Sequence, residues 1–194
     1  MTRNSEITRA TSETSVECRL DLDGVGTSDV KTGLGFLDHM LTALAKHGRI
    51  DLTLLATGDT EVDDHHTVED CAIVLGRALS EALGDRSGIA RFGYSYAPLD
   101  ESLSRAVVDL SGRPWPEINL SLTRDTINDV ASENLTHFFR TLAMEARMAL
   151  HVDVIRGDND HHKAESAFKA VALALREAVA VSGDEVPSTK GSLT

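Results

Sequence analysis

The spacing of apolar residues along the chain predicts strands and helices in the same order in each of two halves. Alternation of apolar and polar positions is typical of a half-buried strand, and apolar positions three or four residues apart are typical of a helix facing a core. On these patterns, the first half is expected to contain a strand at 13–22, a helix at 36–45, a strand at 50–56 and a helix at 66–83. Gly84 follows the last helical positions and is suited to ending that helix.

The second half repeats this order with one additional strand. It is expected to contain strands at 104–110 and 117–122, a helix at 136–150, a strand at 151–155 and a helix at 165–180. Strands and helices mixed in this way, twice over, predict an α+β fold built by internal duplication of two sheet-and-helix halves. We place the first repeat half at residues 1–95 and the second at 96–194. No linker rich in proline, glycine or serine separates them, so the halves are expected to pack together as one unit.

Composition and charge narrow the classes of protein. The chain has 194 residues, of which 41% are hydrophobic, and this fraction is ordinary for a globular protein. A net charge of -12 argues against nonspecific binding of nucleic acid. No apolar run approaches the ~20 residues of a membrane span, and the N-terminus lacks the apolar core of a signal peptide. A cytoplasmic protein with no nucleic-acid and no membrane partner is therefore expected.

One motif occurs once in each half and carries the candidate chemistry. The sequence Asp-His-His-Thr-Val-Glu occupies residues 64–69, and Asp-His-His-Lys-Ala-Glu occupies residues 160–165. Glycine and aspartate precede each copy, and a further histidine lies upstream in each half, His39 in the first and His137 in the second. Two related halves that each carry such a cluster are most simply interpreted as a pair of linked metal sites.

Helical geometry makes each motif a chelating pair. Residues four positions apart lie on one face of a helix, which pairs His65 with Glu69 and His161 with Glu165. The middle histidines, His66 and His162, point roughly 100° away around the helix. They are expected to bind the ion held by the other half, and His39 and His137 are expected to complete two sets of three imidazoles and one carboxylate.

The ligand types limit the metal but do not select it. Four protein ligands on an octahedral ion leave two positions for substrate, as a catalytic site requires. Imidazole and carboxylate without thiolate suit Mn, Fe, Co or Zn. Asp64, Asp70 and Asp160 are candidates to accept hydrogen bonds from the imidazole N–H groups. The remaining histidines, His47 and His151, have no match in the repeat and are expected to be packing or surface residues.

Motifs along essentially the whole chain resemble those of the imidazoleglycerol-phosphate dehydratase family, and the doubled histidine cluster makes the resemblance specific. The matching stretches are 36–40, 58–70, 91–93, 98–101, 109–114, 157–163, 168–170 and 187–191. The resemblance implies a fold like domain 2 of ribosomal protein S5. It also implies two Mn(II) ions per active site and a homo-oligomer of 24 subunits built from trimers, with active sites at the subunit interfaces.

The resemblance further implies a lyase of histidine biosynthesis. Its substrate is a small phosphorylated imidazole: the reaction removes water from D-erythro-imidazole-glycerol phosphate and gives imidazole-acetol phosphate. The hydrogen that is lost is not acidic, because no carbonyl group adjoins its carbon, so the imidazole ring must relay the electrons. Two Lewis-acidic ions flanking the ring nitrogens favour the imidazolate, which can expel the neighbouring hydroxyl group.

Matches to the family also assign roles to particular residues. Glu13 is the first candidate for handling protons near the leaving group and for contacting the substrate, the alternative being a surface residue at a strand edge. The ligands Glu69 and Glu165 are further catalytic candidates, since a ligand carboxylate can also shuttle protons. Cationic or hydroxyl donors that match the family's phosphate-binding positions are Arg91, Arg113, Lys169, Ser188 and Lys190. For Lys169, a salt bridge to Glu165 one helical turn earlier is the alternative.

Two other functions stay open on the residues alone. One is a binuclear metal hydrolase of a phosphorylated small molecule, which would use a bridging carboxylate and hold its ions ~3.5–4 Å apart. The other is a storage or structural metal protein, whose sites would be coordinatively closed. A storage or structural metal protein would not explain the basic residues that match the family's phosphate-binding positions.

Overall fold

The computed structural model describes residues 3–191 and 193, and its first half forms a four-stranded sheet with two helices. The elements of this half are β1 (Asn4–Ala10), β2 (Thr14–Asp21), β3 (Ser28–Lys31), α1 (Gly35–Gly48), β4 (Asp51–Gly58) and α2 (His65–Leu83). The strands lie in the order β1-β2-β4-β3. The pairs β1–β2 and β2–β4 are antiparallel, whereas β3 is parallel to β4.

The second half repeats this topology. Its elements are β5 (Phe92–Leu99), β6 (Ser102–Asp109), β7 (Trp115–Asn119), a small hairpin of β8 (Thr126–Ile127) and β9 (Val130–Ala131), α3 (Ser132–Glu145), β10 (Ala149–Arg156) and α4 (Asp160–Ala178). The order is β5-β6-β10-β7, again with the last pair parallel. The predicted α+β fold with an internal duplication is confirmed. The predicted likeness to ribosomal protein S5 domain 2 stays a prediction.

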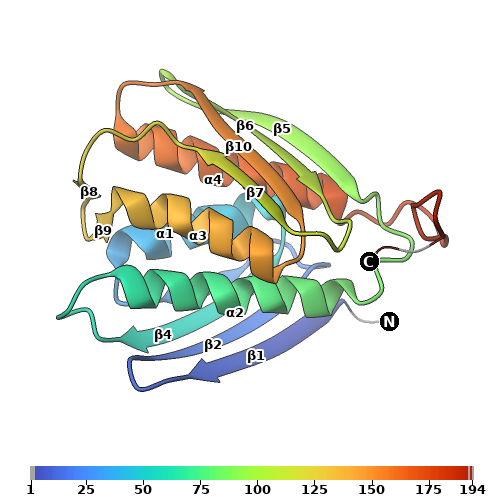
Figure 1. The fold of residues 1–194 in the computed structure, drawn as a ribbon, viewed down its shortest axis with the longest axis horizontal. Helices are drawn as coiled ribbons and strands as arrows, with labels where there is room; N and C mark the ends of the chain where they lie inside the picture. The colour runs from blue at the N-terminus through green and yellow to red at the C-terminus, as the bar shows by residue number, and fades with distance from the viewer. Residues whose placement is uncertain (1–2, 192, 194) are drawn as a thin grey trace.

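The helices lie between the two sheets, as Figure 1 shows. Helix α2 covers β1 and β2, and α4 covers β5 and β6, because each helix turns its apolar stripe toward its own sheet. The two helix pairs then meet in the middle, where α1 packs against α4 and α2 packs against α3. One continuous apolar cluster joins both halves, so each half completes its core with residues of the other.

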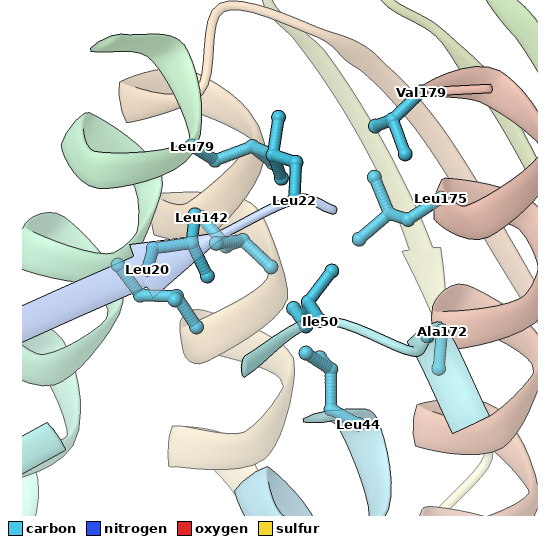
Figure 2. Close-up of a pocket in the computed structure, with 11 residues that line it drawn as sticks. Leu20, Leu22, Leu44, Ile50, Leu79, Leu142, Ala172, Leu175 and Val179 are labelled. Carbon is cyan, nitrogen blue, oxygen red and sulfur yellow. The ribbon is translucent and has the colours of Figure 1, made fainter. Parts of the chain in front are cut away.

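This shared core is visible where aliphatic side chains of both halves surround one small apolar cavity (Figure 2). Leu20, Leu44 and Ile50 approach it from the first half, and Leu142 and Leu175 approach it from the second. The halves are therefore held to each other by aliphatic packing.

The structure corrects several predicted boundaries. Strand β5 runs across the boundary placed between residues 95 and 96, so the chain passes from one sheet to the other before Phe92. The helix expected at 136–150 begins at Ser132 and ends at Glu145, because a reversal with Arg147 at φ 52° leads into β10. Strands β1 and β3 were not predicted, since much of each strand is exposed and polar. Strand β5 was not predicted because its large side chains, Phe92, Tyr94 and Tyr96, are exposed. None of the helices within residues 3–191 combines the length and the apolar character needed to cross a bilayer.

Candidate metal centre

The first group of candidate ligands consists of His65, Glu69 and His137, whose ligand atoms all lie within 4.8 Å of one another. His65 and Glu69 stand on the first turns of α2, and His137 stands on the adjacent helix α3. Glu69 Oε1 lies 3.0 Å from His137 Nε2, and the imidazole rings of His65 and His137 stack with centroids 5.0 Å apart. A chelating pair of the first half thus meets a histidine of the second half.

The second group is the mirror of the first and consists of His39, His161 and Glu165. His161 and Glu165 stand on the first turns of α4, and His39 stands on α1, which packs beside α4. Glu165 Oε2 lies 3.1 Å from His39 Nε2 and 3.2 Å from His161 Nε2. Here a pair of the second half meets a histidine of the first, so the two halves exchange one histidine each.

The carboxylate of the second group is ionised at neutral pH. Burial raises the pKa of Glu165, but hydrogen bonds from Lys169 and His39 outweigh burial and bring the pKa down to about 2. Lys169 Nζ lies 2.7 Å from Glu165 Oε1. This salt bridge is the alternative that was predicted for Lys169. The other carboxylate oxygen, Oε2, faces both histidines.

The donor atoms and their spacing fit a divalent metal ion. Ligands about 2.0–2.2 Å from a common ion stand about 3 Å apart when they are at right angles, and the three measured distances of 3.0, 3.1 and 3.2 Å agree with that spacing. Each group offers two imidazoles and one carboxylate, which suits a borderline or hard ion. Thiolate is absent from both groups: Cys18 and Cys71 are buried, and burial raises the pKa of the Cys18 thiol to about 12.

The two middle histidines lie beside these groups without belonging to them. His66 Nδ1 is 3.1 Å from Asp59 Oδ2, and His162 Nδ1 is 2.8 Å from Glu101 Oε2. These hydrogen bonds raise the pKa of both histidines. Within one chain, the histidine that joins His65 is His137 and not His162. The combination of each chelating pair with the other half's middle histidine stays a prediction for an assembled form.

The prediction that Asp64, Asp70 and Asp160 accept hydrogen bonds from imidazole N–H groups is wrong. Each of these carboxylates accepts hydrogen bonds from other donors. Asp64 accepts from the backbone N–H of Ala131, Asp70 from Arg9, and Asp160 from Lys163 and from the backbone at residues 123–124. These bonds tie each helix N-terminus to a neighbouring segment.

Three acceptors that sequence reasoning missed hold the imidazoles instead. They are Asn134 at 2.9 Å from His65 Nδ1, and Asp59 and Glu101 at the middle histidines. The glycine–aspartate pair before the first motif signalled Asp59, and the motif at 98–101 signalled Glu101, but nothing in the sequence connects Asn134 with His65.

Glu13 lies at the same end of the molecule as the first group. It is in the turn between β1 and β2, where Thr11 accepts the backbone N–H of Glu13 and closes the turn. Its side chain is exposed, and Oε2 is 3.9 Å from His66 Nδ1. A carboxylate beside a candidate ligand and open to solvent can exchange protons with a molecule bound there.

Four of the five phosphate candidates lie at the other end of the helices. Arg91 donates to Asp109 and to the carbonyl of Pro187, and its backbone N–H bonds to the carboxyl end of α4. Arg113 is exposed in the turn after β6. Ser188 and Lys190 are in the segment after α4, which Figure 1 places far from the start of that helix. Since α4 has 19 residues and a helix rises about 1.5 Å per residue, one chain does not bring these side chains to its own histidines.

The two histidines without a match in the repeat, His47 and His151, are both exposed. They were predicted to be packing or surface residues, and the structure confirms that both are surface residues. His47 lies on the last turn of α1, where partial burial lowers its pKa and the nearby cations of Lys169 and Lys46 lower it further.

Comparison with known proteins shows the family of the chain. The family model described as Imidazoleglycerol-phosphate dehydratase matches residues 32–175. A protein of that name from Methanothermobacter thermautotrophicus is 55% identical over 191 residues, which cover 98% of each chain. Another, from Phytophthora nicotianae, is 59% identical over 194 residues; the match covers 98% of this chain but only 42% of that protein.

A solved structure shares the fold. The crystal structure of imidazoleglycerol-phosphate dehydratase from Staphylococcus aureus superposes with a TM-score of 0.84 and 37% sequence identity, covering 92% of this chain and 99% of that one. The duplicated fold, the two carboxylate–imidazole groups and these relatives define the class of a hydro-lyase. The chain belongs to the imidazoleglycerol-phosphate dehydratase family.

Proposed function

We infer that this chain removes water from D-erythro-imidazole-glycerol phosphate to give imidazole-acetol phosphate, in histidine biosynthesis and in the cytoplasm. Family membership supports the reaction. The observation that carries the site is the exchange of one histidine between the two halves, which produces two matched groups of two imidazoles and one carboxylate. A substrate with two ring nitrogens suits a site with two such groups.

Two Mn(II) ions per active site are proposed as cofactors. His65, Glu69 and His137 would hold one ion, and His39, His161 and Glu165 would hold the other. When bound, the ions supply Lewis acidity toward the ring nitrogens of the substrate. The spacing of about 3 Å between donor atoms and the absence of thiolate from the two groups support this assignment.

The chain's own carboxylates handle the protons. Glu13 is exposed and close to His66, and no lysine or arginine among the described residues pairs with it, so it can accept or return a proton at the carbon chain of the substrate. Glu165 is ionised, and its Oε1 pairs with Lys169. This carboxylate is therefore suited to binding a metal ion and is rarely protonated. Glu69 lies against His137 and has a side chain that is 37% exposed, so it is the better placed of the two ligands for proton exchange.

A homo-oligomer completes the site. The phosphate candidates Arg91, Arg113, Ser188 and Lys190 are separated from the histidines of their own chain by the length of α4, so a second copy has to supply them. We propose an assembly of 24 subunits built from trimers, with each active site formed between copies. The guanidinium and ammonium groups are then the phosphate-binding donors.

The alternative of a binuclear hydrolase is not favoured. Such an enzyme holds its ions ~3.5–4 Å apart with a bridging carboxylate. The two groups contain different carboxylates, Glu69 and Glu165, and neither carboxylate belongs to both groups. The family membership of the chain agrees with a lyase.

A turnover assay tests the proposal. Metal-free protein is assayed with imidazoleglycerol phosphate before and after addition of Mn(II), and the mass of the same samples is measured. We expect turnover only with the metal and an assembled mass for the active sample. Turnover without metal would reject the role of the ions, and a loaded, folded protein without any turnover would reject the reaction.

A further inference from the structure

The turn that carries Arg113 is fastened to the reversal between α3 and β10. Nε of Arg147, in that reversal, donates to the carbonyl of Gly112 at 3.3 Å. On the other side of Arg113, the backbone N–H of Trp115 donates to the carbonyl of Met148 at 3.0 Å. Gly112 is buried and has a φ of 80°, a conformation that favours glycine. The exposed side chain of Arg113 therefore extends from a backbone that is held on both sides.

A buried arginine fixes the reversal in turn. Arg86 follows α2 and is only 5% exposed. Its guanidinium group donates to the carbonyls of Ala146 and Arg147, both at 2.8 Å, and to the hydroxyl of Ser80 at 3.3 Å. Carbonyl groups at the end of a helix lack partners within the helix, and these two follow the last turn of α3. Arg86 thus ties the end of α2 to the end of α3, and Arg147 continues the connection to the turn.

Both guanidinium groups donate to neutral acceptors. Among the described residues, no carboxylate pairs with Arg86 or Arg147, whereas Arg91 at the start of the same turn is paired with Asp109. Burial lowers the pKa of Arg86, and the cation of Arg147 lowers it further, while the carboxylate of Asp109 acts in the opposite direction. Burying a cation without a paired anion costs free energy. A phosphate group bound near this end of the molecule would offset that cost.

We propose that Arg147, itself held by Arg86, is a positioning residue for phosphate binding, because it fixes the turn from which Arg113 reaches the phosphate group of the substrate. The inference rests on the proposed function for the identity of that substrate. It adds two arginines that do not touch the substrate but determine where its phosphate group is bound. A guanidinium group binds phosphate through two parallel hydrogen bonds, and this geometry is lost when the backbone beneath Arg113 shifts.

The test measures binding of inorganic phosphate by calorimetry, together with KM and kcat, in Arg147→Met, which lacks the donor to Gly112. We expect about 10-fold weaker phosphate binding and a similar rise in KM, the loss of roughly one charge-assisted hydrogen bond. The values of kcat, Mn(II) content and assembled mass should stay near wild type. Arg147→Lys keeps a cationic donor and should recover part of the loss. Arg19→Met, which removes an exposed arginine of β2 paired with Glu6 and Glu17, is the matched control and should change none of these quantities.

A double mutant separates positioning from a general loss of structure. If Arg147 acts through Arg113, adding Arg147→Met to Arg113→Ala should weaken the binding of inorganic phosphate no further. Additive losses would overturn the inference, and so would unchanged phosphate binding in Arg147→Met. Arg86→Lys keeps the cation but lacks the fork that holds both carbonyls, so it should weaken phosphate binding as well. Should Arg86→Lys fail to fold, the cycle of Arg147 with Arg113 decides alone.

The wild-type protein distinguishes failure of this inference from failure of the proposed function. A Mn(II)-loaded wild type without turnover would contradict the reaction, and the cycle measured on phosphate binding would still decide the role of Arg147. A wild type that binds no inorganic phosphate would overturn the inference.

Discussion

Glu69 Oε1 lies 3.0 Å from His137 Nε2, although the first residue belongs to one repeat and the second to the other. The mirrored contact joins Glu165 to His39 at 3.1 Å. Both contacts follow from the middle layer of helices, where α2 lies against α3 and α1 lies against α4. Neither half alone contains a complete ligand group, so the candidate metal sites exist only because the two halves pack together.

Replacement of the ligand carboxylate in one group should remove one ion and spare the other. Glu69→Gln keeps the size of the side chain but lacks the charge, so we expect loss of one of two bound Mn(II) ions and at least about a 100-fold fall in turnover. Metal content per chain and the turnover number measure the two effects. Glu61→Gln, at an exposed position before α2, is the control. Retention of both ions in Glu69→Gln would contradict the ligand role.

Removal of the proposed proton-handling group should separate chemistry from metal binding. Glu13 is not in either ligand group, so Glu13→Gln should bind Mn(II) normally and assemble normally. Its turnover should fall by about 100-fold or more, the usual contribution of a general acid or base. Metal content, mass and turnover are measured on one preparation. Near-normal turnover would show that Glu13 is only a surface residue of the β1–β2 turn.

Mixing two inactive variants tests whether neighbouring copies share an active site. Glu13 is in the turn between β1 and β2, and Arg113 is in the turn between β6 and β7. Figure 1 shows these two turns at opposite ends of the molecule, so each side chain is expected to serve a different site. Co-assembly of Arg113→Ala with Glu13→Gln chains should restore a measurable fraction of wild-type turnover, because some sites then combine two intact side chains. Each variant assembled alone is the control. No recovery in mixed assemblies of confirmed composition would place both residues in one chain's site.

Much of the fold could be predicted from apolar spacing, and the reason lies in which elements are buried. Helices α1 and α2 carry continuous apolar stripes and were predicted close to their observed bounds. The helix predicted at 165–180 also carries such a stripe, but α4 begins earlier, at Asp160. Strand β1 was missed because only Ser5 along it is buried. The chelating pairs were predictable because the spacing of four residues on a helix is a local property.

The partner of each pair was not predictable from spacing. Helix geometry shows that His66 points away from His65, but the histidine that completes the group depends on which helices pack together. That is a tertiary property, and the structure gives His137. The same limit explains why Asn134 was missed and why the sequence alone did not show that four of the phosphate candidates lie far from the histidines of their own chain.

The loop before β3 should lose stability in acid when its central acceptor is protonated. Asp51 Oδ1 accepts the backbone N–H groups of Val25, Gly26 and Thr27, and these bonds, the one from Thr27 first, lower the pKa of Asp51 below its ordinary 3.8. A lowered folded-state pKa stabilises the fold fully above the unfolded-state value and loses that contribution as pH falls through the folded-state value.

The free energy of unfolding of Asp51→Asn should therefore differ from wild type near neutral pH, and the difference should shrink below about pH 3.8. Urea unfolding at several pH values measures it. Asp184→Asn, an exposed change after α4, is the control for general charge effects. A difference that stays constant with pH would show that the ionised carboxylate of Asp51 adds nothing to stability.

The aromatic cluster between α3 and α4 should be a main source of stability. The Phe168 ring lies 4.4 Å from that of Phe139 and 5.4 Å from that of Phe138, and all three side chains are fully buried. Phe168→Ala should lower the free energy of unfolding by about 3–5 kcal/mol through lost burial and a residual cavity. Val25→Ala, at a side chain 75% exposed, should change it by less than about 0.5 kcal/mol. Comparable losses in the two variants would contradict this packing.

The most direct test of two metal sites formed by exchange between the halves is anomalous diffraction from crystals grown with Mn(II). We expect two strong peaks per chain, one touching His65, Glu69 and His137, the other touching His39, His161 and Glu165. Peaks at other side chains, or no peaks in crystals of an active preparation, would contradict the account.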